Sequence, residues 1–297
     1  MNKIIYVPGR NPKPPATLHR EQLLRCLLHG VQQQDTDVAR AIESSAAFSL
    51  VAWNYLLYGH NRNIKPDIAW VDHLLEEGTL HEQYIDYALS LKYWFSKLLY
   101  TIGDAAHWLI PLIPDARIRS SIRDTEHYFA NRDNIACRIR EILKLALRRH
   151  VEAGDRLLLV GHSMGSIIAY DALWELHHVE GMEQCVDCLL TIGSPLGMRY
   201  VQKRLVGREQ PHPRRYPGNI RSWVNISARG DLVALDPALG NDFGDMVTEK
   251  YIDSIDDRAD CIFNHYRDER GLNVHKSYGY LVNPVVDRVI ADWWKAA

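Results

Sequence analysis

The sequence has no excess of charge of either sign. Its 297 residues include 35 lysines and arginines and 37 aspartates and glutamates, which gives a formal net charge of -2. Proteins that bind nucleic acid present a basic surplus, and neither half of this chain resembles a charged tail. We therefore expect no nucleic-acid partner.

Long apolar runs are also missing. The N-terminal run from Ile4 to Val7 is too short for the core of a signal peptide, so we interpret it as a first strand and expect a cytoplasmic protein. A later apolar stretch, Ala105 to Pro114, is broken by prolines and lies between Asp104 and Asp115. It is shorter than the roughly 20 residues that a membrane-spanning helix needs. The sequence thus predicts no transmembrane segment.

Cysteine is sparse and scattered. The five cysteines are odd in number, which fits reduced thiols better than a disulfide framework. Cys185 and Cys188 form a single CxxC, with no second cysteine pair and no histidine pair at the spacing of a zinc finger. We interpret them as small residues that lead into a buried strand. No metal and no organic cofactor is expected.

Apolar, β-prone runs alternate with helical patterns along most of the chain. This alternation is typical of an α/β protein whose parallel sheet has helices on both faces. The expected strands are Lys3–Val7, Phe48–Tyr55, Arg156–Val160, Val186–Ile192 and Arg221–Ser227, with a sixth at either Tyr251–Ile255 or Ala259–Tyr266. The clearest expected helices are Leu18–Val31, Asn134–His150 and Val285–Trp294.

Residues 66–130 do not fit the alternation. Aromatic and leucine side chains recur there at helical spacing from Tyr84 to Leu98, and the apolar patch Trp108–Ile113 follows them. We expect a helical insertion, or cap, within a single domain that spans residues 1–297. Two interpretations stay open, a packed insertion and a lid that moves over a site.

The stretch LLLVGHSMGSIIAYDALWEL, which starts at Leu157, begins as a strand and ends as a helix. Between the two lies Ser163, framed by Gly161 and Gly165 in the pattern G-x-S-x-G. A sharp strand-to-helix turn exposes the serine hydroxyl, and its crowded flanks accept only small residues. The turn also leaves the Met164 N–H free at a helix N-terminus, where it can stabilise an oxyanion. The alternative interpretation is an ordinary turn with glycines beside a serine.

The region from Arg156 to Ser194 resembles the α/β-hydrolase superfamily of serine esterases and lipases. The similarity lies in LLLVGHSMGSIIAYDAL and in the LLTIGSPLG that follows it. The resemblance implies that KIIYVPGR corresponds to the family's oxyanion strand and that two leading antiparallel strands are missing. It also implies a shortened, mostly parallel sheet of about six strands. With the strands numbered as they occur along the chain, their order in the sheet should be 2-1-3-4-5-6.

The resemblance further implies a catalytic triad in the order serine, acid, histidine, each after a strand. The acid should follow RSWVNIS, where the chain offers Asp231 and Asp236, and Asp231 matches the family better. The histidine should precede the last helix, which favours His275 over His265. Tyr278, three residues after His275, fits a tyrosine that the family often has there.

The loop VPGRNPKPP should supply the second oxyanion donor. Gly9 lets the backbone turn inward, and the N–H of Arg10 is the natural donor beside that of Met164. The prolines remove N–H groups and stiffen the loop. For the Arg10 side chain we expect a solvated position, with an anionic partner as the alternative. Asp124 and Tyr128 are weaker candidates for reaching the cleft.

These residues predict a serine hydrolase that cleaves a small-molecule carboxylic ester through an acyl-enzyme, with no cofactor. The apolar insertion weakly favours a lipophilic acyl chain. A thioesterase or an acyltransferase would use the same triad, and a catalytically inactive binding protein on a hydrolase fold is the alternative from another class. Transient contact with a membrane surface through Trp108–Ile113 is compatible with the esterase. The sequence does not predict the oligomeric state.

Overall fold

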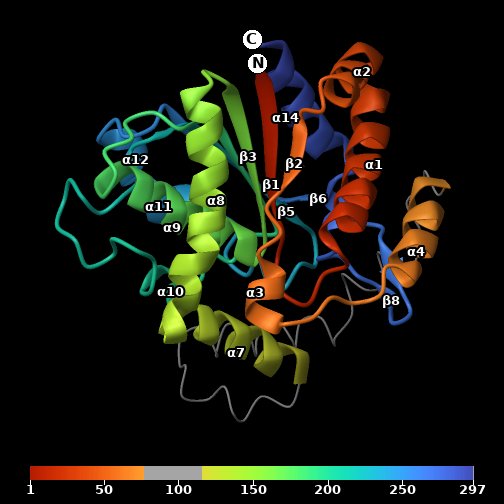
Figure 1. The fold of residues 1–297 in the computed structure, drawn as a ribbon, viewed down its shortest axis with the longest axis horizontal. Helices are drawn as coiled ribbons and strands as arrows, with labels where there is room; N and C mark the ends of the chain where they lie inside the picture. Colours follow the sequence, from red (N-terminus) through yellow and green to blue (C-terminus); the bar gives the residue numbers. More distant parts are fainter. Residues whose placement is uncertain (77–115, 297) are drawn as a thin grey trace.

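In a computed structural model of the chain, the structure describes residues 1–76 and 116–296 (Figure 1). The apolar patch Trp108–Ile113 and the aromatic series from Tyr84 to Leu98 lie outside these residues. The two described ends of the expected insertion are helical, namely α4 (Lys65–Glu76) and α7 (Ala116–Ala130). The division into one domain with an insertion at residues 66–130 stays a prediction.

The centre of the described structure is a parallel sheet of six strands. These are β1 (Asn2–Val7), β2 (Phe48–Leu50), β3 (Arg156–His162), β4 (Val186–Ile192), β5 (Ile220–Ala228) and β6 (Ser254–Ile262). They lie in the order β2-β1-β3-β4-β5-β6, and every neighbouring pair is parallel. Strands buried on both faces have nearly continuous apolar sequences, and Leu157 to Val160 of β3 are fully buried. The predicted α/β class with a parallel sheet is confirmed.

Helices cover both faces of this sheet (Figure 1). Ile5 and Leu159 point to the face of α8 (Ile135–Glu152) and α9 (Met164–His178). Their neighbours Ile4 and Leu158 point to the other face, against α1 (Ala16–Gln34) and α14 (Pro284–Lys295). The remaining described elements are α2 (Thr36–Ser44), α3 (Asn54–Tyr58), η2 (Arg132–Asn134), α10 (Arg199–Gln202), α11 (Leu239–Phe243), α12 (Asp245–Thr248), β7 (Arg267–Asp268), β8 (Gly271–Leu272) and α13 (Ser277–Tyr280).

Two strands differ from their expected bounds by more than two residues at one end or both. The prediction that the second strand extends to Tyr55 was wrong, because β2 ends at Leu50 and α3 begins at Asn54. The Asn54 side chain donates hydrogen bonds to the loop after β1 and so directs the chain away from the sheet. The last strand, Ser254–Ile262, overlaps both expected positions. Among the described strands it pairs with β5 alone, and its exposed edge carries charged residues that break the apolar pattern.

The chain termini lie together at the amino end of the sheet, whereas α3 and α7 lie at its carboxyl end (Figure 1). At the amino end, the Asn2 side-chain amide donates to the Trp294 carbonyl at 3.0 Å. Loops that follow parallel strands gather at the carboxyl end, where ligands bind in open α/β sheets. Among the described residues, no helix is long and apolar enough to cross a membrane.

Candidate active site

Ser163 occupies the turn between β3 and α9 in a strained backbone conformation. Its φ is 54° and its ψ is -126°, a region that residues other than glycine seldom adopt. The Ser163 N–H donates to the Ile192 carbonyl of β4 at 3.1 Å, which ties the turn to the neighbouring strand. The local geometry is that of a sharp strand-to-helix elbow.

The two glycines of the motif are required by close backbone contacts. A Cβ at Gly165 would lie 2.1 Å from the Val7 carbonyl oxygen, and one at Gly161 would lie 2.8 Å from the Ser166 Cα. Both separations are far below van der Waals contact. Ser163 is therefore framed by glycines because β1 and the first turn of α9 leave no room for side chains.

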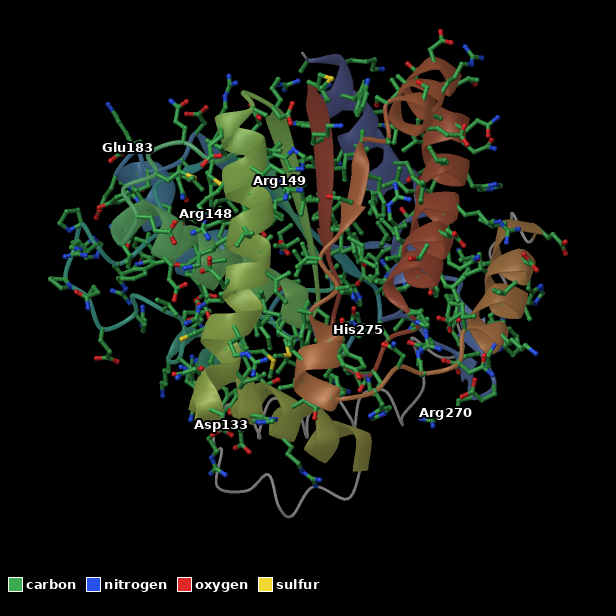
Figure 2. The ribbon with its side chains drawn as sticks, in the orientation of Figure 1. Asp133, Arg148, Arg149, Glu183, Arg270 and His275 are labelled. Atoms are coloured by element: carbon green, nitrogen blue, oxygen red, sulfur yellow. The ribbon has the colours of Figure 1, made fainter. Side chains whose placement is uncertain are left out.

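His275 connects Ser163 to Asp231 through two hydrogen bonds. The Ser163 hydroxyl lies 2.9 Å from His275 Nε2, and His275 Nδ1 lies 2.8 Å from Asp231 Oδ2. Figure 2 shows His275 at the end of the sheet that carries α3 and α7. The Asp231 side chain is fully buried, and the His275 side chain is 26% exposed. The arrangement is that of a nucleophile, a base and an acid that orients the base.

The alternative acid and base do not join Ser163. Asp236 follows Asp231 on the same loop, and its carboxylate accepts from the Ala238 N–H at 3.4 Å, as in a turn. His265 lies beyond β6, with its ring stacked on Phe263. Of the sequence candidates, the structure brings Asp231 and His275 to the serine.

Asp231 is held by donors besides His275. The Tyr280 hydroxyl donates to its Oδ2 at 2.7 Å, and the Val233 N–H donates to its Oδ1 at 2.9 Å. Burial raises the pKa of Asp231, but the charge of His275 and these hydrogen bonds outweigh burial and leave that pKa below its usual value. Asp231 is thus an ionised carboxylate that can stabilise a protonated His275.

Tyr280 was not among the residues that the sequence predicted. The resemblance pointed to Tyr278, whose hydroxyl instead donates to Asp67 Oδ2 at 2.8 Å. Both tyrosines lie on α13, directly after His275, and both are fully buried. No sequence signal separates them, because the direction of each ring depends on how α13 packs.

His162, beside Ser163, supports the loop that carries His275. Its Nε2 lies 2.8 Å from the His275 carbonyl oxygen, and the two rings are 4.8 Å apart. Burial and the charge of His275 hold the pKa of His162 well below its usual value. His162 is therefore neutral and donates to the His275 main chain, away from the Ser163 hydroxyl.

The loop after β1 lies directly against Ser163. A Cβ at Gly9 would lie 2.8 Å from the Ser163 Cβ, so glycine is required where the loop passes the serine. In the part of the chain that the structure describes, neither the Arg10 N–H nor the Met164 N–H donates a hydrogen bond. Among the described residues, both predicted oxyanion donors thus have no acceptor, and each adjoins in sequence a residue of this contact, Met164 following Ser163 and Arg10 following Gly9.

Three side chains on or beside α3 fix this loop. The Trp53 indole N–H donates to the Pro8 carbonyl at 2.8 Å, and the Asn54 amide donates to the carbonyls of Gly9 at 2.8 Å and Asn11 at 3.0 Å. The hydroxyl of Tyr58, the third, accepts from the Asn11 N–H at 2.9 Å. Sequence reasoning missed all three. Trp53 and Asn54 lie in the run Phe48–Tyr55 that was interpreted as a strand, and Tyr58 lies just beyond that run.

The expectation of a solvated Arg10 side chain was wrong. Its guanidinium lies 3.3 Å from Asp124 Oδ2 on α7, and the Tyr58 hydroxyl donates to the same oxygen at 3.0 Å. Asp124 thus links α7 to the loop that carries the Arg10 amide. Tyr128, the second weak candidate, is buried and donates instead to Asp171 on α9 at 2.9 Å.

The remaining candidate groups, namely metal ligands, cysteines and a surface hollow, do not add to the site around Ser163. Among the described residues, no three His, Cys, Asp or Glu side chains lie close enough to hold a metal ion. Cys185 and Cys188 are buried free thiols at the start of β4, as expected for residues that lead into a strand. A surface hollow of about 760 Å³ between α7 and α10 includes Asp124 but no residue of the Ser163 group.

Comparison with known proteins adds no relative. No protein-family model matches the chain, and no match was found among curated proteins or among solved structures. The site must therefore be interpreted from its own geometry.

Proposed function

We propose that this protein is a serine hydrolase of the α/β-hydrolase type that cleaves carboxylic esters of small molecules. The proposal rests on one observation, the continuous hydrogen-bonded series from Ser163 through His275 to Asp231 on a strained elbow. The strand order supports it, because β2-β1-β3-β4-β5-β6 is the order expected of a shortened α/β-hydrolase sheet.

The reaction follows from the positions of these groups. Ser163 Oγ attacks the acyl carbon while His275 Nε2 accepts the hydroxyl proton, and buried Asp231 stabilises the resulting imidazolium through Nδ1. The amides of Met164 and Arg10 donate to the tetrahedral oxyanion. His275 then returns the proton to the leaving alcohol. Water, deprotonated by His275, attacks the acyl-enzyme, which releases the acid and restores the Ser163 hydroxyl.

Thioesterases and acyltransferases share these groups, so the acceptor and the leaving group define the activity. An inactive binding protein is disfavoured, because a chain that has lost catalysis has no need to hold three polar side chains in this alignment. The preference for a lipophilic acyl chain rests on residues outside those described. It stays a prediction, as do the cytoplasmic location and the transient contact with a membrane surface.

A panel of p-nitrophenyl esters of increasing acyl length, beside thioester and amide analogues of one acyl group, tests the proposal. We expect the wild-type protein to hydrolyse the oxygen esters and the Ser163→Ala variant to lose this activity. Hydrolysis of the thioester alone would reassign the leaving group. Equal rates for wild type and Ser163→Ala would contradict the proposal.

A further inference from the structure

A cluster of charged side chains lies beside the candidate site, around one buried carboxylate. Asp67 of α4 is 3% exposed, and it accepts hydrogen bonds from Arg62 and from the Tyr278 hydroxyl. Lys276, the residue after His275, brings its ammonium to 3.3 Å from Asp67 Oδ1. The two cations leave the pKa of Asp67 below its usual value, although burial alone would raise it. Asp67 is thus ionised and shared between Arg62 and Lys276.

Lys13 adds a third basic side chain to this cluster. It is half-buried in the loop that carries the Arg10 amide, and its carbonyl accepts from the Arg62 N–H at 3.1 Å. Within the part of the chain that the structure describes, its ammonium makes no ion pair and no hydrogen bond. Burial, followed by the charges of Lys276 and Arg62, holds the pKa of Lys13 well below its usual value. Among the described residues Lys13 therefore has no counter-charge, and a bound oxyanion would favour its protonated form.

The neighbouring acids do not supply that counter-charge. Asp124 pairs with Arg10, and the Asp268 carboxylate accepts from the Asn273 amide at 2.7 Å. Asp67 already forms ion pairs with Arg62 and Lys276. Like charges held together without enough negative charge create a positive potential that favours a bound anion.

Two members of the cluster belong to chain segments that carry the candidate site. Lys13 follows Arg10 on the oxyanion loop, and Lys276 follows His275. After burial and His275, the charges of Lys13 and Lys276 contribute to the lowered pKa of His162, the neighbour of Ser163. A substrate bound at Ser163 therefore lies within range of the field of these cations.

We propose that Lys13, together with Lys276 and Arg62, binds an anionic group of the substrate, so that the preferred esters carry a carboxylate or a phosphate-like oxyanion away from the reacting carbonyl. The inference rests on the proposed function, because it assigns the substrate class of the same site. Lysine is well suited to such a group, since its ammonium forms charge-assisted hydrogen bonds with oxyanions.

The first test compares a charged and a neutral ester of the same acyl chain, mono-p-nitrophenyl adipate and its methyl ester, by the release of p-nitrophenol. We expect the wild-type protein to favour the acid in kcat/KM by about tenfold or more, as one charge-assisted hydrogen bond provides. Lys13→Met should lower this ratio by about tenfold, whereas Lys65→Met, which removes an exposed lysine at the start of α4, should preserve it. Inhibition of methyl-ester hydrolysis by acetate or by methyl phosphate then tells which oxyanion is preferred. A ratio near one that neither variant changes would overturn the inference.

A second test measures the binding of ester ligands to a variant that cannot hydrolyse them. Titration calorimetry of Ser163→Ala should show that monomethyl adipate binds more tightly than dimethyl adipate, and addition of Lys13→Met should remove the difference. If the wild-type protein hydrolyses the neutral ester and this difference is absent, the anionic subsite is wrong and the proposed hydrolase stands. If no ester is hydrolysed but the difference is present, the hydrolase is wrong and the anionic subsite stands.

Discussion

Replacement of Asn54 by alanine should lower catalysis through the loop that carries the Arg10 amide. Asn54 is 3% exposed, and its amide donates to the carbonyls of Gly9 and Asn11, on either side of Arg10. Each such bond contributes about 0.5–1.5 kcal/mol net, so two contribute about 1–3 kcal/mol. This corresponds to about a 5- to 150-fold loss in the population of the observed loop conformation. We expect kcat/KM to fall by a factor within that range, which reaches only the lower end of the roughly 10²- to 10³-fold cost of deleting an oxyanion donor.

Asn219 provides a matched control at the other end of the sheet. It is 2% exposed and precedes β5, and its amide donates to the Leu173 carbonyl at 3.0 Å. Both asparagines have a buried Oδ1 with no partner among the described residues. Hydrolysis of p-nitrophenyl acetate and thermal unfolding would be measured for Asn54→Ala and Asn219→Ala. We expect both to lower the melting temperature and only Asn54→Ala to lower kcat/KM. If kcat/KM responds equally in the two variants, or in neither, the loop does not depend on Asn54 for catalysis.

Three further outcomes are expected. His275→Ala should reduce kcat for p-nitrophenyl acetate by on the order of 10⁴- to 10⁶-fold and His265→Ala should retain most activity, and the reverse pattern would transfer the role of base to His265. Burial raises the pKa of Asp171 to about 6, so wild type should lose up to about 3 kcal/mol of unfolding free energy relative to Asp171→Asn as the pH rises from about 4 to about 6. Urea unfolding at several pH values across that window measures this loss, and an unfolding free energy that depends on pH equally in the two proteins would refute it. Gly165→Ala should abolish fluorophosphonate labelling and destabilise the fold, because its Cβ would lie 2.1 Å from the Val7 carbonyl oxygen, and normal labelling with an unchanged thermal melt would contradict this.

The sequence predicts the centre of the sheet well and its edges poorly. Leu157 to Val160 form an unbroken apolar run because β3 is buried on both faces, so the strand is visible without tertiary information. Within the described sheet the edge strand β6 has a partner on one side only, and charged residues interrupt its apolar pattern. The run after Leu50 is as apolar and aromatic as a strand. Its end is determined by bonds from Asn54 to a loop 45 and 43 residues away, which no local pattern records.

The candidate site likewise contains residues that the sequence predicts and residues that it does not. Ser163 is visible because the elbow imposes a local motif, and the order of the family narrows the acid and the base to two residues each. The structure places Asp231 and His275 within hydrogen-bond distance of their partners. Tyr280 could not be predicted, because its hydroxyl reaches Asp231 through the packing of α13 rather than through a motif. Asp124 was a weak candidate for the cleft, but its pairing with Arg10 depends on the position of α7, which no local pattern records.

The most direct test of the account is whether Ser163 is a reactive nucleophile that depends on its two partners. A fluorophosphonate probe reacts covalently with an activated serine, and mass spectrometry of peptides locates the modified residue. We expect one label per chain, on Ser163, and a large loss of labelling in His275→Ala and Asp231→Asn variants that retain the wild-type thermal melt. Labelling of another serine, or labelling of Ser163 that persists at the same rate in both variants, would contradict the account.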